Sequence, residues 1–248
     1  MRFLCLTCEA LARPVYYCAA LSPHIVDVVL VERGLHHKPD NLRISLQQKI
    51  DSAETSYQYI LLVYGLCGKA TAGLVAKNIP LVIPRVHDCI SLFLGSRQRY
   101  QEQFENHPGT YWYAQDYIER ADGTASSLSM GADFEDDIHK VYEEYVAKYG
   151  QDNADYLMEV MGAWKQHYQR AVYIHMGISD GAIVEERAQQ EAQRRGWTFE
   201  KMAGDLLLIR SLINGDWNAD SDENFLVVPP GGQVAMSNDD HVIRCDLV

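Results

Sequence analysis

The side chains of this sequence with the clearest chemical potential are three cysteines that come just after predicted strands. Cys8 follows the first apolar stretch of the chain by two residues, and Cys67 and Cys89 each come shortly after a later apolar stretch. In a parallel sheet the carboxyl ends of all strands lie along one edge, and ligands bind in the crevice outside that edge. These three thiols, far apart in the sequence, are therefore predicted to lie close together in space.

Three thiolates from separate loops suit a soft metal centre, either a zinc ion or an iron–sulfur cluster with one open coordination position. His87 and Asp88 directly precede Cys89 and are candidates for a fourth ligand, a partner of a ligand or a general acid/base. The alternative for any single cysteine is that it only fills the core, because free cysteine is among the most buried residue types. We expect this role for Cys5 and Cys18.

A second chemical interpretation uses Cys67 alone. It stands in the sequence Gly65-Leu66-Cys67-Gly68, a tight turn that is predicted to open a helix. The helix dipole and the free N–H groups of the first turn would lower the pKa of this thiol. His87 would then complete a nucleophile–base pair of the kind that hydrolases and transferases use. The glycines are explained by the tight turn whether or not the cysteine reacts.

Further residues are candidates for contacts with a small substrate. His175 ends a predicted strand in the second half of the chain, with a structural histidine as the alternative. Arg85, Ser96 and Arg97 could bind a carboxylate or a phosphate, and solvated helix charges are the alternative for the arginines. Trp112 belongs to an unusually aromatic run and could line the pocket of a flat ligand, or it could pack beneath a helix.

The elements that must position these residues follow from short apolar runs that alternate with helical patterns. This alternation predicts an α/β protein with mainly parallel sheets. Strands are expected at residues 3–6, 26–31, 59–63, 81–83, 111–113 (an edge strand), 171–174, 197–202 and 225–228. Helices are expected at residues 9–20, 40–52, 70–77, 90–104, 132–149, 153–168, 180–195 and 205–214. We interpret them as two Rossmann-like lobes, residues 1–120 and 169–248, with a helical connection over 121–168 and a cleft between the lobes.

Length and charge narrow the class of protein. The 248 residues carry a net charge of −12, which argues against general binding to nucleic acids and to anionic membrane surfaces. No apolar stretch approaches the roughly 20 residues that span a bilayer. The first apolar run is interrupted by Glu9 and Arg13, so it is too short for a secretory signal. We therefore expect a cytoplasmic protein whose six cysteines are reduced.

Several runs of the chain resemble an uncharacterised bacterial and archaeal family, the domain-of-unknown-function 1638 family. The resemblance rests on residues 64–68, 84–90, 94–96 and 109–112, and extends to 216–217 and 227–231, with His87-Asp88-Cys89 as its most specific part. It implies a role in anaerobic one-carbon or methylamine-type metabolism, because such proteins are often encoded beside corrinoid-dependent methyltransferases. The family pattern also implies a further glycine where Lys69 or Ala70 stands here.

The leading hypothesis is a metal- or iron–sulfur-dependent enzyme that acts on a small molecule in the cleft between the lobes. Cys8, Cys67 and Cys89 would bind the metal, His87, Asp88 and His175 would act as catalytic groups, and Arg85, Ser96, Arg97 and Trp112 would contact the substrate. One alternative is an accessory protein that binds a corrinoid or a metal for a methyltransferase, although the Asp-x-His-x-x-Gly pattern of corrinoid carriers is not found. A further alternative is a cysteine-nucleophile hydrolase or transferase.

Overall fold

The computed structural model describes residues 1–37, 39–120, 146, 150, 151, 153, 168–217 and 223–247. Within it the chain forms two compact units. The first unit comprises residues 1–101, 176–179 and 203–248, and the second comprises residues 102–175 and 180–202. The predicted helices at 132–149 and 153–168, and the connection over 121–168 that they form, lie almost entirely outside the described residues.

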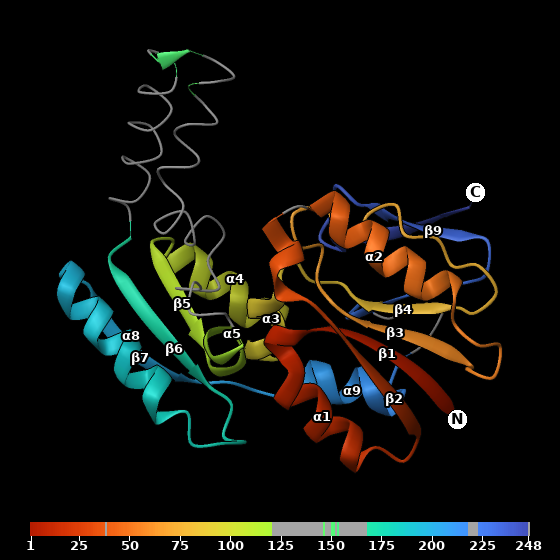
Figure 1. The fold of residues 1–248 in the computed structure, drawn as a ribbon, viewed down its shortest axis with the longest axis horizontal. Helices are drawn as coiled ribbons and strands as arrows, with labels where there is room; N and C mark the ends of the chain where they lie inside the picture. The colour runs from red at the N-terminus through yellow and green to blue at the C-terminus, as the bar shows by residue number, and fades with distance from the viewer. Residues whose placement is uncertain are drawn as a thin grey trace. The chain divides into compact units, whose positions relative to one another are not determined.

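A five-stranded sheet forms the centre of the first unit (Figure 1). Its strands are β1 (Arg2–Cys8), β2 (Ile25–Val31), β3 (Tyr59–Val63), β4 (Leu81–Pro84) and β8 (Phe225–Val228), in the spatial order β2-β1-β3-β4-β8. The first four are parallel, and β8 runs antiparallel to β4. The four parallel strands agree with the prediction, because continuous Val, Ile and Leu runs suit strands that are covered on both faces.

Helices cover both faces of this sheet. After the short 3₁₀ helix η1 (Glu9–Leu11), α1 (Ala12–Leu21) leads from β1 to β2 and packs beside α9 (Leu207–Asn214). Figure 1 shows these two helices on one face of the sheet and α2 (Pro39–Asp51), which leads from β2 to β3, on the other. Connections that change face in this way are the mark of a doubly wound α/β sheet.

The helix predicted at residues 70–77 is wrong. In its place the chain forms turns through residue 73, and Val75 then makes an isolated antiparallel bridge to Gln233 of β9 (Gly232–Met236). β9 forms an antiparallel hairpin with β10 (Ile243–Leu247). The N–H of Val234 donates to the carbonyl of Leu74 at 2.8 Å, and that of Gly73 donates back to Val234 at 2.7 Å. The physical reason is that a remote strand, rather than the segment itself, satisfies these backbone groups.

The helix predicted at residues 90–104 is divided into α3 (Cys89–Leu94) and α4 (Arg97–Asn106). Gly95 separates them with a φ of 69°, the left-handed conformation that commonly ends a helix. A Cβ atom at Gly95 would lie only 2.6 Å from the Cβ of Asp205. The break therefore requires glycine for two reasons, the positive φ and the close neighbour.

The second unit contains a three-stranded sheet in the order β5-β6-β7. Its elements are β5 (Thr110–Ala114), α5 (Gln115–Glu119), β6 (Arg170–His175), α8 (Ala182–Arg195) and β7 (Thr198–Ala203), and β5 runs parallel to β6. Buried Tyr, Val and Ala side chains of β5, β6 and α8 form its core.

Two strands were assigned to the wrong lobe by sequence. β5 was expected at the edge of the first lobe but pairs with β6, and β8 was expected in the second lobe but pairs with β4. The locations of both strands were correct, because local hydrophobicity reveals a strand. Which strand it pairs with depends on contacts between residues far apart in sequence, and the pattern does not carry that information.

Candidate functional site

The carboxyl ends of β1, β3 and β4 lie next to one another. Thr7 is paired with Val63 at the ends of β1 and β3, and Leu61 is paired with Val82 on β3 and β4. Cys8, at the end of β1, and the cysteines that follow β3 and β4 therefore belong to three adjacent strands. This confirms the strand adjacency on which the predicted grouping of the thiols depended.

The order of the strands places a reversal of the winding between β1 and β3. From β1 the chain moves outward to β2 and then returns across β1 to reach β3, so the direction of winding reverses at this point. In doubly wound sheets the reversal opens a crevice outside the carboxyl ends of the two strands, and ligands bind there. Cys8 follows the strand on one side of this point and Cys67 follows the strand on the other.

The loops after β3 and β4 are fastened together by their backbones. The N–H of Leu66 donates to the carbonyl of Val86, and the N–H of Cys67 donates to that of His87, both at 2.9 Å. Gly65 makes this contact possible, because a Cβ atom there would lie 2.7 Å from the backbone nitrogen of Asp88. Backbone atoms cannot move aside for a side chain, so this position requires glycine.

The turn that carries Cys67 has an unusual backbone. Cys67, Gly68 and Lys69 have φ values of 46°, 64° and 77°, and the N–H of Ala70 closes the turn on the carbonyl of Cys67 at 3.2 Å. Non-glycine residues in this region are strained, and such strain concentrates at functional sites. The turn does not begin a helix, so the predicted lowering of the Cys67 pKa by a helix dipole does not apply.

Cys8 is the most deeply buried of the three cysteines, with 2% of its surface exposed. Burial raises the pKa of its thiol to about 12. Its sulfur accepts a hydrogen bond from the backbone N–H of Ala10 at 3.5 Å, and that bond acts in the opposite direction by favouring the thiolate.

Cys67 and Cys89 are only partly buried, and their thiols interact electrostatically. Burial raises the pKa of Cys67 most, followed by the charge of Asp88. The pKa of Cys89 is raised first by burial, then by Cys67 and Asp88, and also by Cys8. Backbone N–H groups act in the opposite direction and lower the pKa values of Cys67 and Cys89, but less than burial raises them. The sulfur of Cys8 accepts a hydrogen bond from a backbone amide, that of Ala10.

The three thiols share one edge of the sheet without forming a closed ligand set. Within the residues that the structure describes, no three His, Cys, Asp or Glu side chains are gathered closely enough to hold a metal ion. The side chains present fit a soft metal by their chemistry, since they are thiols.

Asp88 is held in place by hydrogen bonds. Its carboxylate caps α3 by accepting from the N–H of Ile90 at 3.0 Å and of Ser91 at 3.4 Å, and it also accepts from the hydroxyl of Tyr100 at 2.8 Å. Burial raises the pKa of Asp88. The neighbouring His87 side chain is exposed to solvent. The sequence analysis missed Tyr100, which the break at Gly95 brings back toward the start of α3.

Arg85 and Arg97 anchor the C-terminal part of the first unit. The guanidinium of Arg85 donates to the carbonyls of Phe225, at 3.2 Å, and Ile243, and that of Arg97 donates to the carbonyl of Glu223 at 2.7 Å. Both side chains thus bind main-chain carbonyls in this structure. Their predicted role in binding substrate remains a prediction.

The other predicted residues belong to elements other than the loops that carry the thiols. Ser96 accepts a hydrogen bond from the N–H of Arg99 at 3.2 Å, at the start of α4. Trp112 and His175 belong to β5 and β6 of the second unit. Trp112 is buried, and the ring of His175 lies 6.1 Å from that of Tyr173.

Arg33 was not predicted, although it belongs to the same edge of the sheet. It comes just after β2 with 8% of its surface exposed, its N–H donates to the carboxylate of Glu9 at 3.1 Å, and its charge lowers the pKa of Cys8. Tyr64, which follows β3, is also buried, and its hydroxyl pKa is raised by burial and by the thiols of Cys8 and Cys67. Arg33 could have been found by applying to β2 the strand-end argument used for the cysteines.

Comparison with known proteins gives one match. The sequence model of a family described as "Protein of unknown function (DUF1638)" matches residues 30–213. This confirms the resemblance and includes Cys67 and Cys89, whereas Cys8 and the runs at 216–217 and 227–231 fall outside the matched range. No curated protein and no solved structure matches the chain. In the described part of the chain, no helix combines the length and the apolar character needed to cross a membrane.

Proposed function

This chain belongs to the DUF1638 family, whose description assigns no function, and we propose a function from the site itself. The protein is an enzyme that depends on a metal ion or an iron–sulfur cluster, bound through thiolates at the carboxyl edge of the first-unit sheet. Cys67 and Cys89 form the core of the ligand set and Cys8 completes it. A small-molecule substrate takes a remaining coordination position.

One observation carries this proposal: cysteines follow the strands on both sides of the point where the sheet reverses its winding, and a third follows the next strand. Ligand binding at that point is the general behaviour of Rossmann-like sheets, and we extend it to the first unit. Cysteines that only fill a core have no reason to recur at three successive strand ends. The N–H of Ala10 that donates to the sulfur of Cys8 supports the proposal, because such bonds stabilise thiolate ligands.

The residues of the chain would have distinct tasks in such a centre. A metal ion supplies Lewis-acid polarisation of a bound substrate, and a cluster with an open iron supplies the same. The shared hydrogen bonds of the loops after β3 and β4 fix Cys67 relative to Cys89. Asp88, held by Tyr100, remains near both sulfurs and can hold or release a proton.

The direct test is the metal content of protein purified without oxygen. We expect zinc or iron in near-stoichiometric amounts, and an absorption band in the visible range if the centre is a cluster. Cys67→Ser and Cys89→Ser should lose most of the metal, and Cys8→Ser a substantial part. Cys245→Ser is the matched control, because Cys245 is a partly buried cysteine on β10, which is not one of the three thiol-bearing strand ends.

Two results would overturn the metal proposal. One is wild-type protein that contains neither zinc nor iron in meaningful amounts after anaerobic purification. The other is a Cys245→Ser variant that loses as much metal as Cys67→Ser, since this would show that the metal is bound without preference for the site.

A second candidate function is nucleophilic catalysis by Cys67, and one observation favours it: the positive φ of this residue in a sharp turn after a strand. Strained turns of this kind present nucleophiles in other enzymes. The raised pKa of the thiol counts against it, because a nucleophilic cysteine needs its thiolate. Rapid, selective alkylation of Cys67 near neutral pH in metal-free protein would favour the nucleophile, and slow alkylation would exclude it.

A further inference from the structure

The loop after β2 carries a buried cation at the same edge of the sheet as the three thiols. In the parallel register of β1 and β2, Cys8 is paired with Val31, the last residue of β2, and Arg33 follows two residues later. The backbone N–H of Arg33 donates to the carboxylate of Glu9, which directly follows Cys8, at 3.1 Å. This bond connects the loops after β1 and β2 and holds Arg33 beside the first of the thiol-bearing strand ends.

The depth at which Arg33 lies is unusual for a charged side chain. Only 8% of its surface is exposed and its Nε and Nη1 atoms are buried, whereas the preceding Glu32 is exposed. Among the described residues, the buried cations are Arg33 and Arg170, and Arg170 belongs to the second unit. A cation at such depth interacts more strongly with a negative group than a surface cation does, because less solvent screens its charge.

The chain position of Arg33 corresponds to one that contacts ligands in other doubly wound sheets. In dinucleotide-binding sheets, a side chain about 20 residues beyond the first strand-to-helix turn reaches the ligand, with an acidic residue for a ribose hydroxyl or an arginine for a phosphate. Arg33 stands 24 residues after Glu9, which lies in that turn. Its strand is the neighbour of β1, which borders the point where the winding reverses.

The charge of Arg33 also acts on the nearest thiol. It lowers the pKa of Cys8, against the larger raising effect of burial and the raising effect of Glu9. Glu9 carries the charge that would repel an anion. Its carboxylate is partly exposed to solvent, which screens it, and it accepts the N–H of Arg33. An anion bound to the guanidinium would therefore lie close to the thiol edge.

We propose that Arg33 binds the oxyanion group of a small substrate, a carboxylate or a phosphate, while another part of the same molecule occupies the open position of the metal centre. The second contact rests on the proposed function, and the first does not. The planar guanidinium of arginine suits an oxyanion because it can donate two parallel hydrogen bonds. Only a small group can reach a cation that is 8% exposed, and the net charge of −12 opposes a polyanionic macromolecule.

Thermal unfolding of the protein in sodium acetate, acetamide or inorganic phosphate tests this, with sodium chloride added to keep the ionic strength constant. Acetamide has nearly the shape of acetate but no charge. Acetate or phosphate should raise the unfolding midpoint of the wild type in a saturable way, because a ligand that binds only the folded state stabilises it. Acetamide should not raise it. Which of the two anions acts more strongly identifies the oxyanion as a carboxylate or a phosphate.

Three variants assign the binding to Arg33. Arg33→Gln should weaken the affinity for the effective anion roughly tenfold or more, as expected when a hydrogen bond from a charged group is lost. Arg33→Lys keeps the charge at this buried position, so it should bind the anion in preference to acetamide, although less tightly than the wild type. Arg244→Gln is the matched control, because it removes an arginine of β10 that is 53% exposed, and its affinity should equal that of the wild type.

A wild-type protein that neither anion stabilises would overturn the role of Arg33, and so would equal weakening by Arg33→Gln and Arg244→Gln. If Arg33→Gln does not fold, equal responses of Arg33→Lys to acetate and acetamide would overturn it instead. The anion titration requires no metal, and the metal content of Arg33→Lys should equal that of the wild type. Wild-type protein that binds the anion but contains no metal would therefore contradict the metal centre and leave the oxyanion site standing.

Discussion

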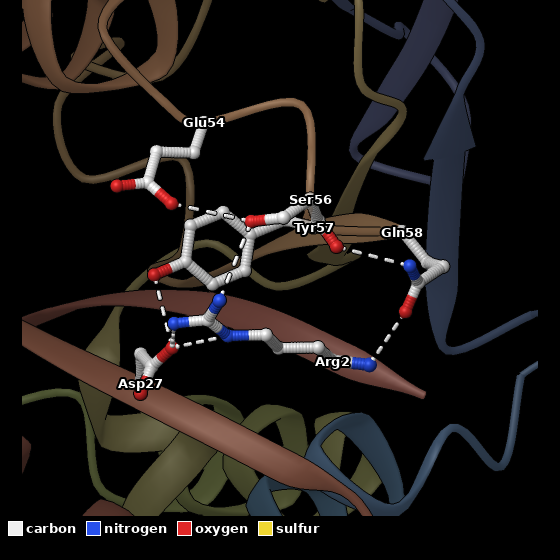
Figure 2. A network of polar contacts seen from close by, with 6 residues as sticks. All are labelled: Arg2, Asp27, Glu54, Ser56, Tyr57 and Gln58. Atoms are coloured by element: carbon white, nitrogen blue, oxygen red, sulfur yellow. Dashed lines mark hydrogen bonds and ion pairs between the residues drawn. The ribbon is translucent and has the colours of Figure 1, made fainter.

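The two ends of the five-stranded sheet differ in the side chains and backbone conformations that they carry. At the amino ends of the strands, Arg2 on β1 pairs with Asp27 on β2, and the hydroxyl of Tyr57 donates to the same carboxylate at 2.9 Å (Figure 2). The Arg2 guanidinium lies 4.8 Å from the centre of the Tyr57 ring. These charged groups are about 40% exposed, so they remain solvated while they cross-link neighbouring strands.

At the carboxyl ends of the same strands, several side chains and backbone conformations are unfavourable for the free energy of folding. Thiols with raised pKa values lie at three strand ends, a buried carboxylate sits among them, and two non-glycine residues have positive φ. None of these features is needed to hold a sheet together, as the amino end shows. Strain and perturbed pKa values that stability does not require are characteristic of functional sites. The comparison therefore supports the proposal that the carboxyl end carries the functional site.

The largest effect is expected for Gly65→Ala. The added Cβ would approach backbone atoms of His87 and Asp88 to 2.7–2.9 Å and separate the two loops. We expect a loss of about 1–3 kcal/mol in the free energy of unfolding, measured by urea denaturation. Gly34→Ala is the matched control, because nothing lies within 4 Å of the position of its Cβ. Equal losses in both variants would show that the loops are not closely fitted.

The next effect concerns the charge of Asp88. This carboxylate raises the pKa values of Cys67 and Cys89, so Asp88→Asn should lower them while retaining a residue that can cap α3. Below its pKa, each unit of decrease raises the thiolate fraction about tenfold. Alkylation by iodoacetamide at pH 8, followed by mass spectrometry, should become several-fold faster at both cysteines. Labelling of Cys245 serves as the internal reference, and unchanged rates at Cys67 would contradict the coupling.

A smaller effect of opposite sign is expected for Lys69→Gly. Lys69 is exposed and has a φ of 77°, a conformation that glycine adopts without strain. Relief of strain should exceed the greater flexibility of the unfolded chain, for a net gain of roughly 0.5–1 kcal/mol in unfolding free energy. Lys77→Gly, at an exposed position without positive φ, should give a loss instead. A loss at both positions would show that the turn is not strained.

The smallest effect is expected at the amino end, for Asp27→Asn. The hydrogen bond from Tyr57 and then the bond and charge of Arg2 lower the pKa of Asp27 in the folded protein. A carboxyl group with a lowered pKa stabilises the fold above its unfolded pKa, near 4, and loses this effect as the pH falls through the folded value. Urea denaturation at pH 7 should show a slightly lower free energy of unfolding for the variant, and this deficit should shrink as the pH falls below about 4. A loss of unfolding free energy larger than that of Gly65→Ala would contradict the comparison, because the amino end would then be the more sensitive of the two.

Much of the first unit could be predicted from local pattern. The strands β1 to β4 begin and end within two residues of their predicted bounds, because each consists mainly of apolar residues. The positions of Cys8, Cys67 and Cys89 after these strands followed directly. The further glycine that the family pattern implies at Lys69 or Ala70 stays a prediction.

The failures all involve partners from distant parts of the chain. The run at 70–77 has helical spacing, yet β9, more than 150 residues later, pairs with it. The guanidinium of Arg85 donates to the carbonyls of Phe225 and Ile243, which are remote contacts that the sequence did not predict. Local sequence specifies the identity of such a group but not which remote atom will reach it.

By itself, the sequence determined which segments form the strands of the sheet and that a cysteine stands at or just after the end of three of them. These features depend on hydrophobic periodicity, composition and turn residues, which influence the structure of only a few neighbouring residues. Only the tertiary structure decided that β1, β3 and β4 are neighbours, that the winding reverses between Cys8 and Cys67, and that two loops meet at Gly65. The physical reason is that strand order is settled by burial and hydrogen bonding between segments that meet only when the chain is folded.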